Sequence, residues 1–347
     1  MEKRLKVSVV QLGELPSRVF HGPSGKELNG SASHEHLIRK IPVDQIKEYN
    51  SGRIIKNIKS ASKRGVDLII FPELALSSFF PYFYTEDNSL LDNFFEEGEF
   101  LQSKYNRLIA DASRKCNIAV AYGYAEKLSQ DERYNTYVLI DKDEEIFKYR
   151  KTHIPGFLKP VNNKHFQYEL KYFKSSKLGY PVFDAQIGQA KAGKVKVGML
   201  ICHDRRYNAP YTMMGLKGVE LIINGFNTPF SLTCEPDLDK YVYQFHYLPQ
   251  QGQSISEGIY ILSASRAGNV YGVKQIAGSC IISPTGDILK NTEELIEIVL
   301  EEDIDLNLSS LVKRQKYDNE RANTNVLFKE LKVYKDSNSA FKENIWQ

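Results

Sequence analysis

Cysteine is scarce in this sequence, and the few cysteines stand far apart. The chain of 347 residues has four, Cys116, Cys202, Cys234 and Cys280, and no two of them form a Cys-x-x-Cys pair. Isolated thiols fit a reduced intracellular protein better than a disulfide framework or a zinc site. We therefore expect a cytoplasmic protein with free cysteines.

Long apolar runs and charge of one sign are missing as well. No window approaches the roughly 18 apolar residues that a membrane-spanning helix needs, and the segment 1–16 has too short an apolar run for a signal peptide. The formal net charge of +3 is small, and lysine and arginine are scattered. These absences argue against a membrane anchor and against nucleic-acid binding. With 42% hydrophobic residues, the chain can instead bury a large core.

Hydrophobic patterning predicts alternating strands and helices. Strands are expected over residues 5–12, 67–71, 118–123, 135–141, 145–151, 195–202, 220–224, 259–265, 278–283 and 297–303, and helices over 44–64, 100–116, 207–216 and 238–257. We expect Pro249 and Gly252 to interrupt the last of these helices. Residues 14–43 lack periodicity, which predicts a long loop or insertion. The alternation predicts an α/β fold whose sheets are covered by helices on their outer faces. We expect one catalytic domain over 1–312 and a charged tail, 313–347, that either extends over a partner subunit or is poorly ordered.

Three chemically active residues stand where hydrophobic strands end. Glu73 follows IIFP, Lys151 follows IFKYR and Cys202 follows VKVGMLI. In α/β proteins such strand ends meet at the carboxyl edge of a sheet, where ligands bind. A carboxylate, an ammonium and a thiol at one edge would provide a base, an electrostatic stabiliser and a nucleophile. The pattern therefore predicts a site for covalent catalysis.

Each of these residues also has a structural interpretation. Cys202 opens a strand–turn–helix segment that suits a nucleophile, with nearby positive charge to lower the thiol pKa, but most free cysteines are simply buried in a core. Glu73, directly after Pro72, is either a desolvated acid–base group or else a helix N-cap or a surface glutamate. Lys151 lies in a charged run that would ordinarily be solvated. His203 is disfavoured as a base for Cys202, because adjacent residues of an extended chain point to opposite faces.

The segments FPELALSSFFP, KYRKTHIPG and GMLICHDRRY resemble the three signature regions of the nitrilase, or carbon–nitrogen hydrolase, superfamily. The order Glu, Lys, Cys matches the superfamily's catalytic order, and the resemblance covers residues 5–306. Within the superfamily, ICHDRRY, GFNTP and GSCIISPTGDI are most similar to N-carbamoyl-D-amino acid amidohydrolases. The resemblance implies a four-layer α-β-β-α sandwich that forms a homodimer or homotetramer and requires no metal or organic cofactor.

The resemblance also implies roles for individual residues. Cys202 would be the nucleophile, Glu73 the general base, and Lys151 the stabiliser of the oxyanion, together with the backbone N–H of His203. Glu169 matches the family's additional active-site glutamate, which positions Lys151 or the substrate amide. The residues that match substrate-binding positions are His153, His203, Arg205, Arg206, Asn227, Thr228 and His246.

The arginine pair bears on the substrate. A guanidinium can bind a carboxylate in bidentate fashion, so Arg205 and Arg206 suit a substrate carboxylate, although we expect at least one of them to be structural. The leading hypothesis is hydrolysis of an N-carbamoyl amino acid to the amino acid, carbon dioxide and ammonia. Two alternatives stay open. The first is hydrolysis or formation of a different small carboxamide, which is favoured by the insertion at 14–43 and by His203, a position where the family usually has asparagine. The second is an inactive binding subunit.

One histidine cluster falls outside this resemblance. His34, Glu35 and His36 stand in the aperiodic segment, and no third ligand of the spacing expected for a metal site accompanies them. We therefore interpret this cluster as a solvated loop.

Overall fold

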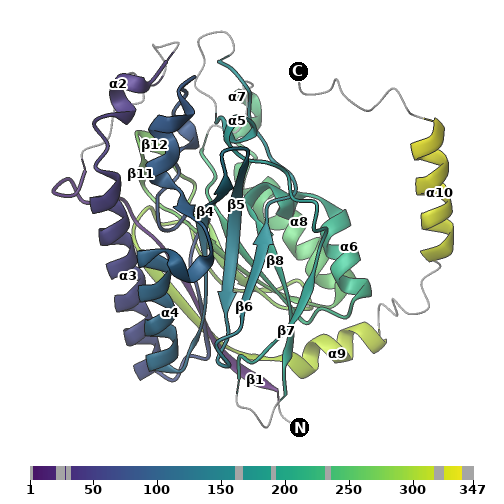
Figure 1. Ribbon diagram of the computed structural model, residues 1–347. Helices are drawn as coiled ribbons and strands as arrows, with labels where there is room; N and C mark the ends of the chain where they lie inside the picture. Colours follow the sequence, from purple (N-terminus) through teal and green to yellow (C-terminus); the bar gives the residue numbers. More distant parts are fainter. Residues whose placement is uncertain are drawn as a thin grey trace.

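Two β-sheets face each other, and helices cover both outer faces (Figure 1). The computed structural model describes residues 3–20, 28, 33–160, 167–188, 193–230, 236–315 and 324–337. Within these residues the layers follow the order α-β-β-α that the sequence predicts.

The first sheet has the strand order β15-β1-β2-β4-β5-β6, with β3 paired to β4. Its strands are β1 (Arg4–Gln11), β2 (Leu68–Ile70), β3 (Glu96–Glu97), β4 (Ala119–Ser129), β5 (Glu132–Ile140), β6 (Ile146–Arg150) and β15 (Ile298–Asp305). Side chains alternate between its faces, as the pleat of a strand requires. In β2, Leu68 and Ile70 join the core between the sheets, whereas Ile69 packs under the helices.

The second sheet has the strand order β14-β13-β10-β9-β8-β7. Its strands are β7 (Val182–Ala185), β8 (Val195–Ile201), β9 (Leu221–Phe226), β10 (Tyr260–Ser265), β13 (Ser279–Ile282) and β14 (Ile288–Thr292), and a separate hairpin pairs β11 (Asn269–Val270) with β12 (Val273–Lys274). Strands β8, β9 and β10 run parallel, as do β1, β2 and β4 in the first sheet. Each sheet therefore has a central parallel part with its strand ends on one side.

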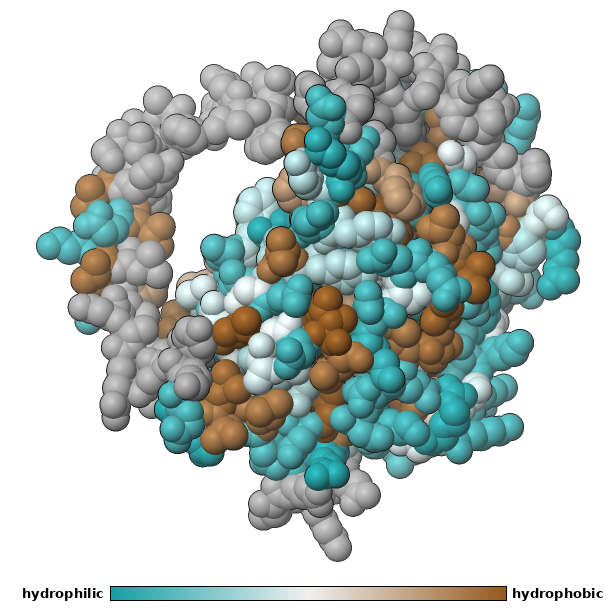
Figure 2. Space-filling view, turned by 180° about the vertical axis from the view of Figure 1, so that it is seen from behind, coloured by the Kyte–Doolittle hydropathy of each residue, from teal (hydrophilic) through white to brown (hydrophobic). Residues whose placement is uncertain are grey.

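Two pairs of helices form the outer layers. Helices α3 (Val43–Lys63) and α4 (Lys104–Cys116) cover the first sheet, and α6 (Asn208–Leu216) and α8 (Val242–Glu257) cover the second (Figure 1). The remaining helices are α2 (Glu35–Ile38), α5 (Glu169–Tyr172), α7 (Pro236–Asp239), α9 (Leu306–Gln315), α10 (Thr324–Ser337) and the 3-10 helices η1 (Phe80–Tyr82), η2 (Asn88–Phe94), η3 (Phe100–Gln102) and η5 (Cys202–Arg206). Helix α10 stands clear of the body in both views (Figures 1 and 2).

The predicted elements agree with the structure apart from a few differences. Strands β7 and β14 were not predicted, because they are short and partly exposed and so lack a clear apolar alternation. The expected interruption at Pro249 is wrong, since α8 continues through it. Helix α9 crosses position 312, where we expected the catalytic domain to end.

The interpretation of the histidine cluster as a solvated loop is wrong for His34. This side chain is only 1% exposed. Its Nδ1 accepts a hydrogen bond from the Tyr84 N–H at 2.8 Å, and its Nε2 donates to the carbonyl of Leu28 at 2.8 Å. Burial, the largest effect, lowers the pKa of His34 and favours the neutral ring that this pairing needs. His34 therefore anchors the segment before α2 to the loop after η1.

Candidate active site

Two glycines bring the backbone of Glu73 close to both sheets. Glu73 follows β2 after Pro72, which has no N–H and ends the strand. A Cβ added to Gly123 of β4 would lie 2.7 Å from the Glu73 Cα, and one added to Gly225 of β9 would lie 2.6 Å from the Glu73 nitrogen. Any side chain at either position would displace this backbone. The Glu73 carboxylate is thereby fixed between the sheets with 0% exposure.

Lys151 lies between two buried carboxylates. Its Nζ donates to Glu73 Oε1 at 2.8 Å and to Glu169 Oε2 at 2.6 Å, and all three side chains are fully buried. Burial opposes the charge of Lys151, but attraction to Glu169 and Glu73 outweighs it and raises the lysine pKa. For Glu169, burial outweighs the nearby ammonium and raises the pKa to about 7. The predicted Glu73, Lys151 and Glu169 therefore form one ionic cluster.

Cys202 lies at the sharp turn between β8 and η5. Its φ of 49° is in the left-handed region, which is uncommon for a residue other than glycine and recurs at functional sites. The Cys202 N–H donates to Asn224 Oδ1 at 3.1 Å, and Sγ donates to the carbonyl of Asn227 at 3.2 Å. The turn therefore presents the sulfur toward the end of β9.

Asn227 connects the thiol to the ionic cluster. Its N–H donates to Glu73 Oε2 at 3.0 Å, while its carbonyl accepts from the sulfur of Cys202. Within the described residues, no hydrogen bond joins Sγ directly to Glu73 or Lys151, although both act electrostatically on the thiol. Glu73, Lys151 and Cys202 thus lie together, and the backbone of Asn227 joins the thiol of Cys202 to the carboxylate of Glu73.

The expectation of a lowered thiol pKa is wrong. Burial is the largest effect on Cys202 and raises its pKa, and the negative charge of Glu73 adds to this. Lys151 and Arg205 act in the opposite direction but do not outweigh burial. Before substrate binds, the thiol therefore keeps its proton and needs a base to remove it.

Asn135 of β5 belongs to the site and was missed from the sequence. Its Nδ2 donates to Glu73 Oε1 at 2.7 Å and to Glu169 Oε2 at 3.2 Å. A single asparagine in a strand gives no signal of its partners, which come from distant segments of the chain. Tyr82 of η1 is also near, since its buried hydroxyl interacts electrostatically with Cys202, Glu73 and Glu169.

Arg205 is the structural member of the arginine pair. It is 1% exposed, and its guanidinium donates to the Cys202 carbonyl at 2.6 Å and to Thr228 Oγ1 at 3.0 Å. It also donates to His246 Nδ1 and stacks over the ring of Phe226 at 4.3 Å. These contacts occupy Arg205 and join Thr228 and His246 to the turn that carries Cys202.

Arg206 is the available member of the pair. Its Nε is buried without a hydrogen-bond partner, and no ion pair to Arg206 occurs in the described part of the chain. Burial and the repulsion of Arg205 lower its pKa to about 10, whereas the Cys202 thiolate would raise it. A guanidinium without an ion pair, in the same 3-10 helix as Cys202, has the chemistry to bind an anion.

His153 and His203 both contact Tyr207, an exposed residue that follows η5. His153 Nδ1 contacts Asp204 Oδ1 at 2.7 Å and its ring stacks on Tyr207 at 4.1 Å. His203 Nε2 contacts the Tyr207 hydroxyl at 2.9 Å, and within the described residues no hydrogen bond joins the His203 ring to Cys202. Burial, the largest effect, and Arg206 lower the His203 pKa to about 3, which keeps the ring neutral.

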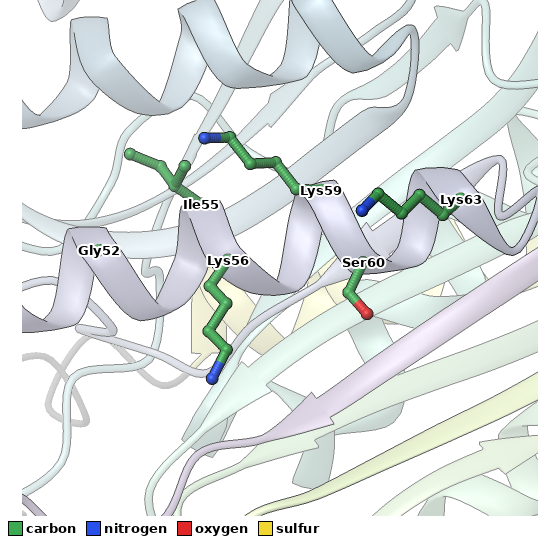
Figure 3. Close-up of a pocket in the computed structure, with 6 residues that line it drawn as sticks. All are labelled: Gly52, Ile55, Lys56, Lys59, Ser60 and Lys63. Carbon is green, nitrogen blue, oxygen red and sulfur yellow. The ribbon is translucent and has the colours of Figure 1, made fainter.

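A hollow of about 390 Å³ lies elsewhere, on the outer side of α3 (Figure 3). Its lining comes entirely from that helix and consists of Gly52, Ile55, Lys56, Lys59, Ser60 and Lys63. No residue of the predicted site lines it. Lysines on one side of a surface helix are ordinarily solvated, so this hollow is not the catalytic site.

The described residues contain no group of three or more His, Cys, Asp or Glu side chains that could hold a metal ion. Their helices include none that is long and apolar enough to cross a membrane.

The chain belongs to the carbon-nitrogen hydrolase family, whose model matches residues 38–314. A nitrilase from Pyrococcus abyssi is 28% identical over 261 residues, which cover 75% of this chain and 84% of that protein. A citrullinase from Francisella tularensis is 27% identical over 220 residues, which cover 62% of this chain and 68% of that protein. The resemblance seen in the sequence is therefore confirmed for the family, and this chain is a hydrolase that acts on carbon–nitrogen bonds.

A solved structure agrees with the fold. The carbon-nitrogen hydrolase from Helicobacter pylori G27 aligns with a TM-score of 0.71 at 20% identity, over 95% of this chain and 98% of that one. The four-layer arrangement described above is thus the fold of the family.

Proposed function

We propose that this hydrolase cleaves N-carbamoyl amino acids to the amino acid, carbon dioxide and ammonia through a covalent intermediate on Cys202. The observation that carries the proposal is the unpaired Arg206 guanidinium beside a buried thiol and its carboxylate–ammonium cluster. The cluster supports amide chemistry, and the guanidinium supports a substrate with a carboxylate near the reacting group.

The proposed reaction begins at the thiol. Glu73 takes the Cys202 proton as the sulfur attacks the carbamoyl carbon, and the Lys151 ammonium stabilises the oxygen that becomes negative. The family resemblance implies that the backbone N–H of His203 is the second donor to this oxygen, and the Cys202 N–H is occupied by Asn224 Oδ1. Glu73 then gives its proton to the departing nitrogen, and ammonia leaves a thiocarbamate on the sulfur. Water, deprotonated by the same carboxylate, attacks the thiocarbamate carbon, the carbon–sulfur bond breaks, and Glu73 returns the proton to the sulfur. The carbamic acid released in this step loses carbon dioxide and leaves the amino acid.

Two unpaired acceptors favour an amide over a nitrile. Oε1 of Glu169 and Oδ1 of Asn227 are buried and have no hydrogen-bond partner. The Asn227 amide has a fixed orientation, because its Nδ2 donates to the carbonyl and the carboxylate of Glu73. Buried acceptors are costly unless a donor arrives. A carbamoyl or carboxamide NH₂ group carries such donors and a nitrile nitrogen carries none, so the same chemistry on another small carboxamide is the second candidate function.

The test is ammonia release from matched panels of N-carbamoyl D- and L-amino acids, with Cys202→Ala as the inactive control. Turnover of at least one panel supports the proposal. If the protein hydrolyses simple carboxamides while both carbamoyl panels stay silent, the substrate assignment is wrong. If no substrate is turned over and a thiol-directed electrophile fails to label Cys202, the chain is an inactive binding subunit.

Arg206→Ala tests the role of the substrate carboxylate. Loss of a charge-assisted hydrogen bond typically costs about 1.5–3 kcal/mol, so kcat/KM should fall by roughly 10- to 150-fold for the carboxylate substrate. The matched control is the same substrate with its carboxylate converted to a carboxamide, for which the two proteins should differ much less. Equal losses for both substrates would show that Arg206 does not bind the carboxylate.

We further propose that the protein forms a homodimer or a homotetramer. Helix α8 and its N-cap residue Tyr241 expose three large apolar side chains, Tyr241 at 42%, Phe245 at 40% and Leu248 at 62%. Contiguous exposed apolar surface of this kind is typical of protein–protein contacts.

A further inference from the structure

Asn135 touches every charged member of the cluster. Its Nδ2 donates to Glu73 Oε1 at 2.7 Å and to Glu169 Oε2 at 3.2 Å, and these are the two oxygens that Lys151 Nζ also contacts. Its backbone carbonyl accepts from the Lys151 N–H at 2.9 Å. One residue of β5 therefore fixes the lysine through the main chain and both carboxylates through the side chain.

The other end of this amide has no partner. Both oxygens near Nδ2 are carboxylate oxygens, so the amide cannot be turned around, and Oδ1 must be the remaining atom. That oxygen is buried and makes no hydrogen bond, and the residue is only 1% exposed. A buried unpaired amide oxygen is costly, so the two hydrogen bonds to the carboxylates must compensate for it. Here only the end that faces the carboxylates is satisfied.

Charge explains why an amide suits this position. Glu73 and Glu169 are both buried and repel each other when ionised, and Lys151 supplies one positive charge between them. An amide NH₂ donates to both carboxylates without adding charge. A carboxylate there would add a third negative group, and an aliphatic side chain would leave the ammonium alone to hold the pair.

We propose that Asn135 is a positioning residue for the reaction at Cys202. It holds Glu73 and Glu169 on the two sides of Lys151, which keeps Glu73 Oε2 turned to the Asn227 amide beside the thiol. It also keeps the lysine ammonium in place for the oxygen of the reacting carbonyl. This inference rests on the proposed function, because it takes Cys202 as the nucleophile and Glu73 as its base.

The experiment measures how fast Cys202 of the full chain reacts with iodoacetamide, by intact-mass and peptide-mapping spectrometry. In this reaction the sulfur forms a bond to carbon, iodide leaves, and the thiol proton passes to the base. The rate is followed over a pH range of about 5 to 9 in the native protein, Asn135→Ala and Asn135→Asp. A shift of one pKa unit in the thiol changes its reactivity at neutral pH by about tenfold.

The two variants have different expected results. Asn135→Asp adds negative charge, so the midpoint of the pH profile should move upward and the rate at neutral pH should fall by about tenfold or more. Asn135→Ala should slow the reaction of Cys202 with iodoacetamide, and the midpoint of its pH profile should move less than in Asn135→Asp. On the best amide substrate, both should lower kcat more than they raise KM, because they disturb the reacting groups and leave Arg206 intact.

Asn106→Ala is the matched control. Asn106 of α4 is also fully buried, accepts from the Tyr122 hydroxyl at 2.8 Å at one end, and has an unpaired Nδ2 at the other. Its replacement should lower the melting temperature and leave the reactivity of Cys202 unchanged. The rates of the Asn135 variants are compared at equal folded fraction. If Asn135→Ala does not fold, the test uses Asn135→Asp, which keeps the shape of the side chain.

Two results would overturn the inference, and they are distinguishable. If folded Asn135 variants react with the native rate and pH profile, Asn135 does not position the site, although the proposed function stands. If Cys202 of the native protein reacts no faster than the partly exposed Cys116, the proposed function itself fails, and the role of Asn135 fails with it.

Discussion

At the scale of the residue, Cys202 depends on its neighbours for reactivity. Burial raises the pKa of its thiol, so the sulfur is protonated before substrate arrives. In the proposed reaction Glu73, which faces the thiol across the Asn227 amide, is the base, and the ammonium of Lys151 compensates the charge.

Glu169 predicts a pH dependence of activity near neutrality. Burial raises its pKa to about 7, so below that pH it gains a proton and one negative charge disappears from the cluster. Lys151 is then balanced by Glu73 alone, which makes Glu73 a weaker base. We expect kcat/KM to fall as the pH drops through about 7 and to be retained above it. The measurement is the pH profile of kcat/KM on the best amide substrate.

Glu169→Gln is the control for that profile. It cannot ionise, so the inflection near neutral pH should vanish and activity should be low throughout. An inflection of unchanged position and depth in Glu169→Gln would assign it to another group.

The sequence allowed some of these residues to be predicted and not others. Glu73, Lys151 and Cys202 stand at strand ends inside motifs, so their type and position both carried information. Asn135 stands inside a strand, and only the fold brings it to the carboxylates. The sequence could not predict that the pKa of the Cys202 thiol is raised, because the shift depends on the balance of burial against nearby charge.

At the scale of the element, β4 and β9 approach the loop after β2 so closely that only glycine should be tolerated at positions 123 and 225. Gly123→Ala and Gly225→Ala each place a Cβ within 2.7 Å of the Glu73 backbone. The backbone must shift, which should cost about 1–3 kcal/mol of stability and displace the base. Denaturant unfolding together with kcat should show both losses.

Gly52→Ala of α3 is the comparison for these variants. A Cβ there meets nothing within 4 Å, so the same substitution should stabilise the helix by about 0.5–1 kcal/mol and leave activity unchanged. If Gly123→Ala and Gly225→Ala behave like Gly52→Ala, the account of how Glu73 is placed is wrong.

The elements that were predicted share a strong pattern. Helix α3 repeats apolar residues at helical spacing and ends two residues before Gly65, whose φ is 74°, and β2 is a continuous apolar run. The sequence gives a weaker signal where tertiary contacts decide the structure. Helix α8 continues through Pro249 and joins the core through Val242 and Tyr247, and β7 forms by pairing with the edge of β8.

At the scale of the whole molecule, the apolar side chains on α8 predict assembly. Leu248, 62% exposed, is the most exposed of the three. Leu248→Glu should weaken a contact between copies and leave the fold intact, because the side chain packs little within its own chain. Light scattering should give an even multiple of 39.7 kDa for the native protein and a smaller mass for the variant. A native monomer, or an unchanged mass in Leu248→Glu, would contradict this.

The central claim is that Cys202 carries the substrate carbonyl during turnover. The most direct measurement is peptide-mapping mass spectrometry of protein quenched in acid while it hydrolyses its best carbamoyl or carboxamide substrate. The account predicts an added acyl or carbamoyl mass on the peptide that contains Cys202, absent from the Cys202→Ala protein, which should also release no ammonia. Ammonia release by Cys202→Ala at the native rate, with no adduct on the native peptide, would contradict it.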